Sequence, residues 1–303
     1  MTGSSKITNA MTVDVEDYFQ VSAFEQVIAR DQWEHVPHRV ERNTDRILAI
    51  FAERGVKATF FTLGWIAERY PALTRRIVEQ GHELASHGYS HIRATQQHPA
   101  EFRADITRAK KILEDISGVA VCGYRAPSYS IGANNLWALD ELKAAGHEYS
   151  SSIYPVRHDL YGMPDAPRFA FYPRGNDGIL EIPITTLHAL GKNWPCGGGG
   201  FFRLYPYAVS RWALRHVNQR DGQSGMFYFH PWEIDPDQPR QKNLRLKTRV
   251  RHYLNLARME DRLQALCRDF SWGRMDEIFL ARAAQIQRVA LPTSAGVSRV
   301  GNF

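Results

Sequence analysis

The feature of this sequence that most restricts its fold is a repeated alternation of short apolar segments with longer amphipathic ones. An amphipathic helix is predicted over residues 39–54, Gly55 ends it, and a buried strand follows at 56–63. The same patterns predict further helices at 71–80, 99–117, 134–145, 207–219 and 259–270, and further strands at 119–123, 179–184 and 226–229. Strands alternating with helices favour βα units, so we expect an α/β protein with a parallel sheet, open or closed into a barrel. The Pro-, Gly- and aromatic-rich region 154–178 is predicted to be a long surface loop.

Composition and charge exclude several classes of protein. The 303 residues are 44% hydrophobic and 23% charged, which is typical of a globular chain and not of a disordered one. The net charge is +6, yet the cations gather only between Arg240 and Arg251. We interpret this basic segment as an exposed helical or loop face, with contact to nucleic acid, an anionic glycan or a membrane surface as the alternative. No nucleic-acid recognition motif accompanies it, so no nucleic-acid partner is expected.

The N-terminus and the cysteines bear on where the protein works. Residues 1–10 lack the apolar segment of a signal peptide, and no run approaches the ~20 apolar residues of a membrane span. The three cysteines are far apart, which argues against a disulfide framework. We therefore expect no transmembrane segment, and a cytoplasmic protein or one bound peripherally at a membrane. The oligomeric state does not follow from the sequence.

Two histidines that could share one metal ion stand in the segment Ser86–His91. His87 and His91 are four residues apart, a spacing that puts side chains on one face of a helix, and the segment is predicted as a loop or a first helical turn. Imidazole nitrogen is a preferred ligand of zinc and its first-row neighbours. The pair predicts two ligands of a metal site whose third ligand comes from elsewhere.

An acidic cluster after a short strand predicted at 11–13 is the best candidate for that third ligand. The apolar run 11–13 leads directly into Asp14, Val15, Glu16 and Asp17. Two neutral histidines and one carboxylate leave coordination positions open, which is typical of a catalytic rather than a structural metal. Another polar residue, His230, also follows a predicted strand, and polar residues at the carboxyl ends of parallel strands gather at one edge of the sheet.

The glycine run Gly197–Gly200 lacks the continuation of a phosphate-binding loop. We interpret it as a flexible loop, with a close approach of backbone to a sugar as the alternative.

Taken in order, these motifs resemble the polysaccharide deacetylase family, the NodB-homology domain of carbohydrate esterase type. The resemblance rests on Asp14, the two histidines, Arg125-Ala126-Pro127, the strand that leads to Pro183, and His230, and covers about residues 11–235. The sequences of segments 13–19 and 229–233 resemble those of the subgroup associated with bacterial exopolysaccharide loci of the exosortase type. The segment after residue 235 resembles the C-terminal extension of that subgroup.

The resemblance implies a distorted (β/α) barrel of the NodB-homology type, with parallel strands and outer helices. It implies a catalytic barrel over 11–235, a helical extension packed on the barrel over 236–290, and a flexible tail over 291–303. It also implies Zn²⁺ or another divalent first-row metal, and removal of N-acetyl groups from the N-acetylhexosamine units of a polysaccharide, an oligosaccharide or a precursor.

The resemblance further implies a role for each site residue. Asp14 is expected to be the general base, Arg125 to hold that base ionised and oriented, and His230 to be the acid that protonates the departing amine. The oxyanion would be held by the metal and a backbone N–H near Tyr129. Expected substrate-binding side chains are Tyr129, Trp232 and Tyr228, the last of which stands where the family has a leucine lining the pocket of the acetyl methyl group.

The acidic metal ligand stays open between two residues. The family has adjacent aspartates, the base and then the ligand, which favours Asp17 as the ligand beside His87 and His91. Strand alternation instead places Asp14 and Glu16 on one side of the chain, which favours Glu16.

Two other functions fit the same residues. One is a catalytically silent glycan-binding module on the same fold, and the other is a related hydrolase that acts on small cyclic amides.

Overall fold

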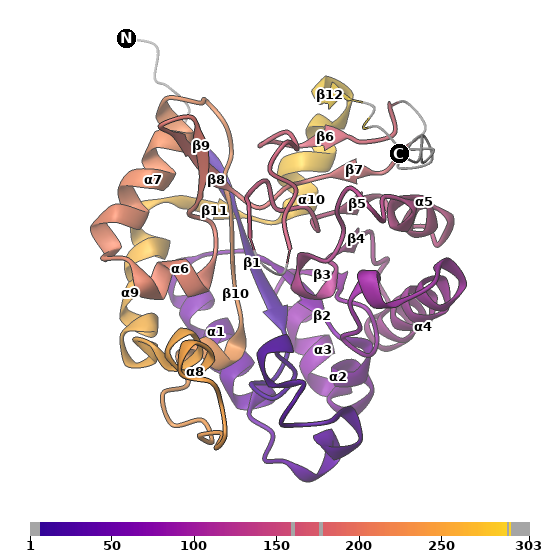
Figure 1. The fold of residues 1–303 in the computed structure, drawn as a ribbon, viewed down its shortest axis with the longest axis vertical. Coiled ribbons are helices and arrows are strands. Elements are labelled where there is room, and N and C mark those ends of the chain that lie inside the picture. The colour runs from indigo at the N-terminus through magenta and orange to yellow at the C-terminus, as the bar shows by residue number, and fades with distance from the viewer. Residues whose placement is uncertain (1–6, 159–160, 176–177, 290, 292–303) are drawn as a thin grey trace, which may run out of the picture.

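A single, mostly parallel sheet runs through the molecule, which we describe from a computed structural model covering residues 7–158, 161–175, 178–289 and 291 (Figure 1). Its ten strands are β1 (Thr8–Val15), β2 (Thr59–Thr62), β3 (Glu83–Ser86), β4 (Gly123–Tyr124), β5 (Tyr149–Ser150), β6 (Phe171–Tyr172), β7 (Leu180–Glu181), β10 (Met226–Phe229), β11 (Ser271–Gly273) and β12 (Gln287–Arg288). Their order is β10-β1-β2-β3-β4-β5-β7-β6-β12, with β11 paired to the start of β1. Among the described residues of this sheet, only β6 and β7 pair in antiparallel fashion.

Helices surround the sheet. They are α1 (Val40–Arg54), α2 (Gly64–Arg69), α3 (Pro71–Glu79), α4 (Pro99–Ser117), α5 (Trp137–Ala144), α6 (Gly199–Leu204), α7 (Tyr207–Gln219), α8 (Leu246–Tyr253), α9 (Met259–Asp269) and α10 (Met275–Phe279). Short 3₁₀ helices lie at η1 (Ser22–Phe24), η2 (Arg30–His35), η3 (Ala94–Gln96), η4 (Pro127–Tyr129), η6 (Pro231–Ile234), η7 (Leu256–Arg258) and η8 (Leu280–Gln285). A separate hairpin is formed by β8 (Thr186–Ala189) and β9 (Lys192–Pro195). The arrangement confirms the expected distorted (β/α) barrel with outer helices.

The predicted helices with clear end signals are confirmed. Helix α4 begins with Pro99 and ends before Gly118, whose φ of 72° is the left-handed conformation that a helix C-terminus often requires. Helix α1 ends in the same way at Gly55, with φ of 62°. Helix α7 and strand β10 match their predicted bounds at both ends.

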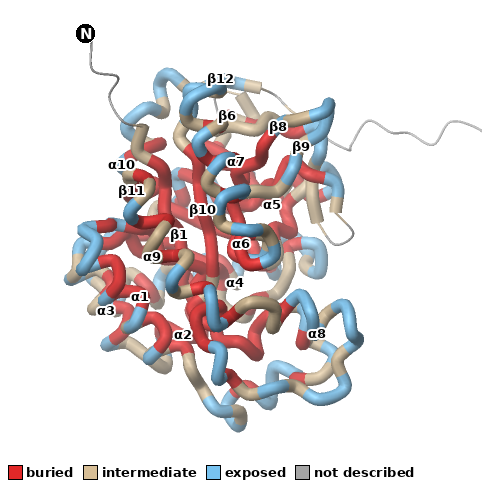
Figure 2. The backbone as a smooth tube through the Cα atoms, turned by 90° about the vertical axis from the view of Figure 1, so that its left-hand side faces the viewer, coloured by how far each residue is buried: buried red, intermediate tan, exposed pale blue. Residues whose placement is uncertain are grey.

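Side-chain alternation along β1 separates an apolar face from a polar one. Met11, Val13 and Val15 point to the core beneath the helices, whereas Thr12 and Asp14 face the inside of the curled sheet. Figure 2 shows β1 and β10 buried along their length while the outer helices alternate between buried and exposed faces. The sheet therefore presents buried polar groups to its own interior.

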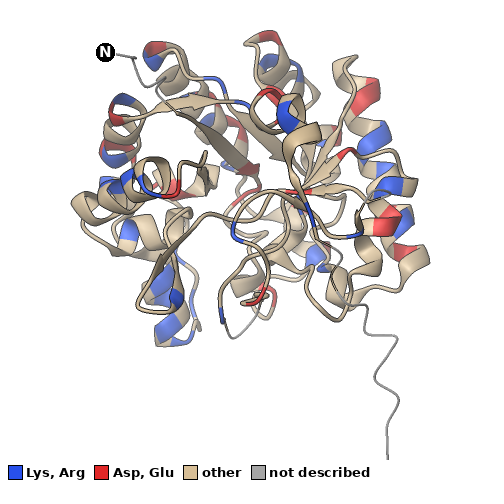
Figure 3. Cartoon of the chain, turned by 90° about the horizontal axis from the view of Figure 1, so that it is seen from above, with Lys and Arg blue, Asp and Glu red and all other residues tan. Residues whose placement is uncertain are grey.

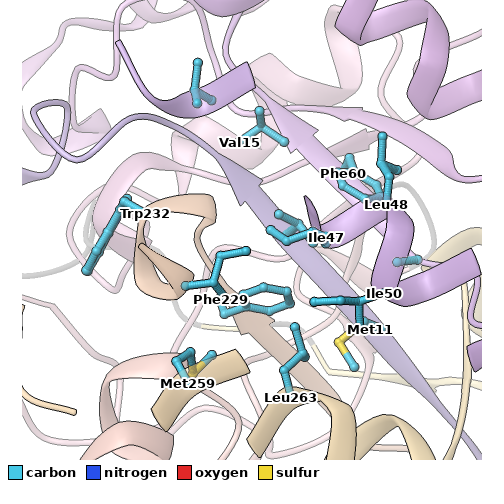
Figure 4. Close-up of a cluster of buried hydrophobic side chains, with 14 of the residues drawn as sticks. Met11, Val15, Ile47, Leu48, Ile50, Phe60, Phe229, Trp232, Met259 and Leu263 are labelled. Carbon is cyan, nitrogen blue, oxygen red and sulfur yellow. The ribbon is translucent and has the colours of Figure 1, made fainter. Parts of the chain in front are cut away.

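The apolar core lies between β1, β2 and β10 on one side and α1 and α9 on the other (Figure 4). Phe229 of β10 points toward Ile47 and Ile50 of α1, and Met259 and Leu263 of α9 close the cluster. This packing fixes the carboxyl end of β10, which carries the predicted acid.

Several predictions about local structure are wrong. The strand predicted at 119–123 begins only at Gly123, and the region 154–178 is not a surface loop, because Tyr154, Val156 and Phe171 are buried and β6 lies within it. Of that region, residues 159–160 and 176–177 lie outside the described residues.

The glycine run is not a flexible loop either. Gly197, Gly198 and Gly199 are buried, and Gly199 starts α6. A Cβ atom on Gly198 would lie 2.5 Å from the ring of Tyr228, and one on Gly199 would lie 2.3 Å from Glu233 Oε1. The glycines are required because protein side chains pack directly on their backbone.

The segment after residue 235 takes part in the sheet. Helix α9 packs on α1 as a helical extension would, but β11 pairs with β1 and β12 pairs with β6. The division into domains at residue 235 stays a prediction, and of the tail predicted to be flexible, residues 292–303 lie outside the described residues. Within the described part of the chain, no helix is long and apolar enough to cross a bilayer.

His147 gives the fold a testable dependence on pH. Burial, with a smaller effect of Lys110, lowers the pKa of His147 to about 3, and the nearby backbone of Cys122 and Gly123 opposes only part of this shift. The unfolded chain binds the proton near pH 6.5, so the stabilisation is present above that pH and is lost as the pH falls. His147→Phe should reduce the loss of unfolding free energy between pH 7 and pH 5 by about 2 kcal/mol.

Chemical denaturation at the two pH values measures this difference. The exposed His35 provides the control, because His35→Phe should leave the pH dependence as it is in the wild type. Equal pH dependence in His147→Phe and wild type would contradict the prediction.

Candidate active site

Four strand ends bring the predicted residues to one edge of the sheet. Asp14 lies at the end of β1, with Glu16 just beyond it, His87 follows β3, Arg125 follows β4, and His230 follows β10. These strands are parallel, so their carboxyl ends meet there. The register of one sheet thus brings together side chains that are up to 216 positions apart in the sequence.

Glu16, His87 and His91 form a buried cluster that suits a metal ion. One potential ligand atom from each residue lies within 4.8 Å of the others. Glu16 Oε2 is 2.7 Å from His91 Nε2, and no well-aligned donor reaches this buried oxygen from the described residues. A carboxylate oxygen left without a partner among ring nitrogens is the arrangement expected of ligands that share a cation.

The electrostatics of the cluster agree with that use. Burial lowers the pKa of His87 to about 4, so its ring is neutral at pH 7. Burial raises the pKa of Glu16, but His91 and His230 outweigh burial and bring the pKa to about 2. His87 Nδ1 lies 2.9 Å from the carbonyl oxygen of Arg125, which can only accept, so Nδ1 carries the proton and Nε2 is left free to bind a metal.

The two histidines meet through a turn and not through a helix. His91 and Gly88 have φ of 53° and 77°, and the segment is a loop, as one of the two predicted alternatives has it. The Asp105 carboxylate accepts hydrogen bonds from the backbone N–H groups of Tyr89 and Ser90 and so holds the loop. A Cβ atom on Gly88 would lie 2.8 Å from Asp105, which explains the glycine after the first histidine.

Of the two candidate acidic ligands, the structure places Glu16, and not Asp17, beside the two histidines. Asp17 turns away from the histidines, and its carboxylate accepts hydrogen bonds from the backbone N–H groups of Tyr18, Arg39 and Val40. These bonds satisfy free amides at the start of α1. Burial still raises the pKa of Asp17 to about 6. Asp17 therefore has a structural place in the fold.

Asp14 is held by a fully buried arginine. Arg125 Nη1 donates to Asp14 Oδ1 at 2.5 Å and to Thr12 Oγ1 at 2.8 Å, and other guanidinium nitrogens donate to Ser151. The second carboxylate oxygen, Oδ2, lies 3.4 Å from the hydroxyl of Tyr129, which donates to it, and 3.9 Å from His230 Nε2. One oxygen of Asp14 is thus fixed and the other faces the pocket.

His230 is oriented by a buried ion pair that was not predicted. Its Nδ1 lies 2.8 Å from Glu233 Oε1, and Arg203 Nε donates to Glu233 Oε2 at 2.6 Å. Burial lowers the pKa of His230, but the Glu16 and Glu233 carboxylates outweigh burial and raise the pKa to about 9. The ring is thus held as a proton donor, with Nε2 directed at Glu16 and Asp14.

A sequence signal for Glu233 exists, whereas none exists for Arg203. In His230-Pro231-Trp232-Glu233 a glutamate stands three residues after the residue that caps a short helix, and its carboxylate accepts the backbone N–H of His230. This is the pattern of a capping box. Arg203 comes from α6, thirty positions away in the sequence.

The three predicted substrate-binding aromatics line one pocket of about 310 Å³ with the site residues. Tyr129 and Tyr228 pack edge to face there, with ring centroids 4.8 Å apart. Trp232 stacks on His230 at 5.2 Å and on His252 at 4.2 Å, so it also supports the acid. Their contact with a substrate stays a prediction.

The place expected for the oxyanion has unusual backbone. Ser128 and Tyr129 have φ of 55° and 52°, a left-handed conformation that costs energy outside glycine and clusters at functional sites. The N–H of Tyr129 itself donates to the carbonyl oxygen of Ala126 and is not free for an oxyanion.

Two family models divide the chain between them. Residues 31–150 match the family described as polysaccharide deacetylase, and residues 151–280 match a domain of unknown function (DUF3473). The chain therefore contains a polysaccharide deacetylase domain of the NodB-homology type, followed by a second family segment. The first match covers His87, His91 and Arg125, whereas Asp14, Glu16 and His230 lie outside it and join the site through the fold.

Several curated proteins are similar to parts of the chain. A peptidoglycan-N-acetylglucosamine deacetylase of Bacillus cereus is 36% identical over 32% of this chain and 36% of its own length. A peptidoglycan deacetylase-like protein of Gibberella zeae is 32% identical over 46% of this chain and 45% of its own length. A chitooligosaccharide deacetylase of Bradyrhizobium sp. is 28% identical over 37% and 48%. The chain spans between about a third and a half of these relatives.

One solved structure is similar over nearly the whole chain. A Mycobacterium smegmatis protein assigned to the polysaccharide deacetylases superimposes with a TM-score of 0.63, at 19% identity, over 96% of each chain. The fold is therefore shared along the segment after residue 235 as well.

The choice between Glu16 and Asp17 predicts different metal contents. Glu16→Gln removes a charged ligand, so elemental analysis after incubation with Zn²⁺ and removal of free metal should show roughly tenfold weaker retention or more. Asp17→Asn should retain the metal and instead lower the melting temperature, because a charged acceptor of three backbone N–H groups is lost.

His87→Ala serves as the reference for loss of a ligand. Loss of metal in Asp17→Asn with retention in Glu16→Gln would reverse the assignment.

Proposed function

We propose that this protein is a metal-dependent hydrolase that removes N-acetyl groups from N-acetylhexosamine units of a bacterial polysaccharide or its precursor. The observation that carries the proposal is the cluster of Glu16, His87 and His91 beside one held carboxylate, Asp14, and one held imidazole, His230. The family of the domain and the names of its relatives, which specify N-acetylglucosamine and chitooligosaccharides, support the same reaction class.

Glu16, His87 and His91 would hold the metal. The donor set of two neutral imidazoles and one carboxylate suits Zn²⁺ or a neighbouring first-row ion, and the unpartnered Glu16 Oε2 fits it. When bound, such an ion lowers the pKa of water toward ~7 and polarises an amide carbonyl.

Asp14 is placed to act as the general base. Arg125 occupies Oδ1 and orients the carboxylate, while Oδ2 faces the pocket, where it can take a proton from the attacking water. The Tyr129 hydroxyl limits the directions that Oδ2 can use. A base that is already held in place lowers the entropic cost of reaching the geometry for proton transfer.

His230 is placed to act as the general acid. Its Nδ1 is bound to Glu233, so the proton on Nε2 is the one directed into the pocket. An amine is a poor leaving group until it is protonated, and imidazolium can deliver that proton. Glu233 acts through His230 and is a positioning residue.

Asp14→Asn tests the reaction against the alternatives. We expect acetate release from N-acetylglucosamine oligomers, measured with Zn²⁺ present, to fall by roughly 10²- to 10⁴-fold, because the base is lost. The exposed Asp31 offers a matched control, since Asp31→Asn should keep full activity.

Other outcomes would assign other functions. A wild type that binds the oligomers without releasing acetate would be a glycan-binding module. Release confined to small cyclic amides would make the protein a small-amide hydrolase.

Variants of the ion pair between Arg203 and Glu233 should separate its effect on protein stability from its effect on activity. Glu233→Gln leaves the buried Arg203 charge unpaired, so the unfolding free energy should fall by about 3–5 kcal/mol. Adding Arg203→Met removes that charge and should restore part of the stability, since the carbonyl oxygens of Arg251, His252 and Leu254 lose their donor. It should not restore kcat, which should stay roughly 10-fold or more below wild type with KM little changed.

Denaturant unfolding and steady-state kinetics on the same preparations check both halves. Recovery of kcat together with stability in the double variant would show that Glu233 serves the fold alone.

A further inference from the structure

One surface away from the active site gathers exposed apolar side chains. Of eight large apolar side chains exposed among the described residues, four line a single pocket of about 250 Å³: Leu190, Trp194, Val209 and Trp212. The pocket lies between the β8–β9 hairpin, α6 and α7, which Figures 1 and 2 show side by side. We call these four side chains the apolar rim. Contiguous exposed apolar patches mark interaction sites, whereas single exposed residues do not.

The hairpin presents its apolar residue at the tip. Leu190 and Gly191 have φ of 54° and 68°, the two left-handed positions of a tight hairpin turn. Asparagine, aspartate or glycine is favoured at the first of these positions. A leucine there adopts an unfavourable left-handed backbone conformation and also exposes an apolar side chain to water. Its side chain is 92% exposed.

The stretch of sequence that forms this surface contains cations but no acidic residue. No acidic residue occurs between Glu181 and Asp221, and of the cations in that stretch Arg203 is buried against Glu233 and Arg211 pairs with Asp269 of α9. Lys192 and Arg215 are exposed and, among the described residues, have no ion-pair partner. A second stretch without acidic residues, 238–259, includes α8, whereas acidic and basic residues intermingle on several other helices (Figure 3).

We propose that the apolar rim is the docking surface for an anionic lipid bilayer. Leucine and valine side chains enter the boundary between headgroups and acyl chains, tryptophan favours the same depth, and cations are attracted to anionic headgroups. An apolar protein partner would use the same side chains but would not require a stretch free of acids. In the absence of a membrane-spanning helix among the described residues, the contact is peripheral.

Flotation of the full chain with lipid vesicles tests the proposal. The protein should float with vesicles of phosphatidylcholine and phosphatidylglycerol, and markedly less with phosphatidylcholine alone or at high salt. The double variant Leu190→Asp/Trp212→Asp should bind the anionic vesicles at least roughly tenfold more weakly. Val119→Asp is the matched control, because Val119 is an exposed apolar residue outside the rim, and this variant should bind like wild type.

A second pair of variants separates charge from apolar contact. Lys192→Ala/Arg215→Ala should weaken binding to anionic vesicles and lose the preference for them. All of these residues lie outside the active-site pocket, so acetate release from a water-soluble oligomer should be unchanged in every variant.

Three results would overturn the proposal. The first is that the wild-type protein does not float with anionic vesicles, and the second is that the rim variant floats as well as Val119→Asp. The third is that the wild type binds no lipid but sediments as a dimer, and that the rim variant sediments as a monomer. The last result would assign the surface to a second copy of the chain.

Discussion

The buried ion pair between Arg125 and Asp14 is the interaction on which the rest of the site depends. The guanidinium is fully buried inside the curled sheet, where an unpaired charge would cost several kcal/mol, roughly 3–5 by comparison with other broken buried pairs. It is satisfied by Asp14 and Thr12 of β1 and by Ser151 beyond β5, so it fastens separate strands together. The backbone carbonyl oxygen of Arg125 accepts a hydrogen bond from His87 Nδ1. One residue therefore orients both the proposed base, Asp14, and a proposed metal ligand, His87.

Long helices with an apolar face and recognisable ends could be predicted from the sequence, whereas very short strands could not. Helices α1, α4 and α7 span at least three turns, show one apolar face and have recognisable ends, so tertiary packing only reinforces what the sequence favours. Strands β4, β5 and β7 are two residues long, too short for any periodicity. They exist because β3 offers its edge to them and each in turn extends the sheet.

The site could be predicted as a set of residues but not as a geometry. Alternation along β1 already places Asp14 and Glu16 on one side, and the structure accordingly brings Glu16 to the two histidines, because side-chain direction is dictated by the backbone. Asp17 falls on the other side and meets the start of α1. Arg203 could not be found, because only the packing of α6 on the end of β10 brings it to Glu233.

The glycines before α6 show how these long-range contacts become possible. Glu233 can be buried behind the His230 ring only if the backbone of Gly199 passes against its carboxylate, closer than any side chain would allow. The same close approach starts α6, whose next residues face two ways: Phe201 and Phe202 line the apolar pocket, and Arg203 neutralises Glu233. A glycine run that suggests flexibility in the sequence is thus a place where side chains pack directly on the backbone behind His230. Any side chain at position 199 would displace Glu233 and release His230 from its orientation.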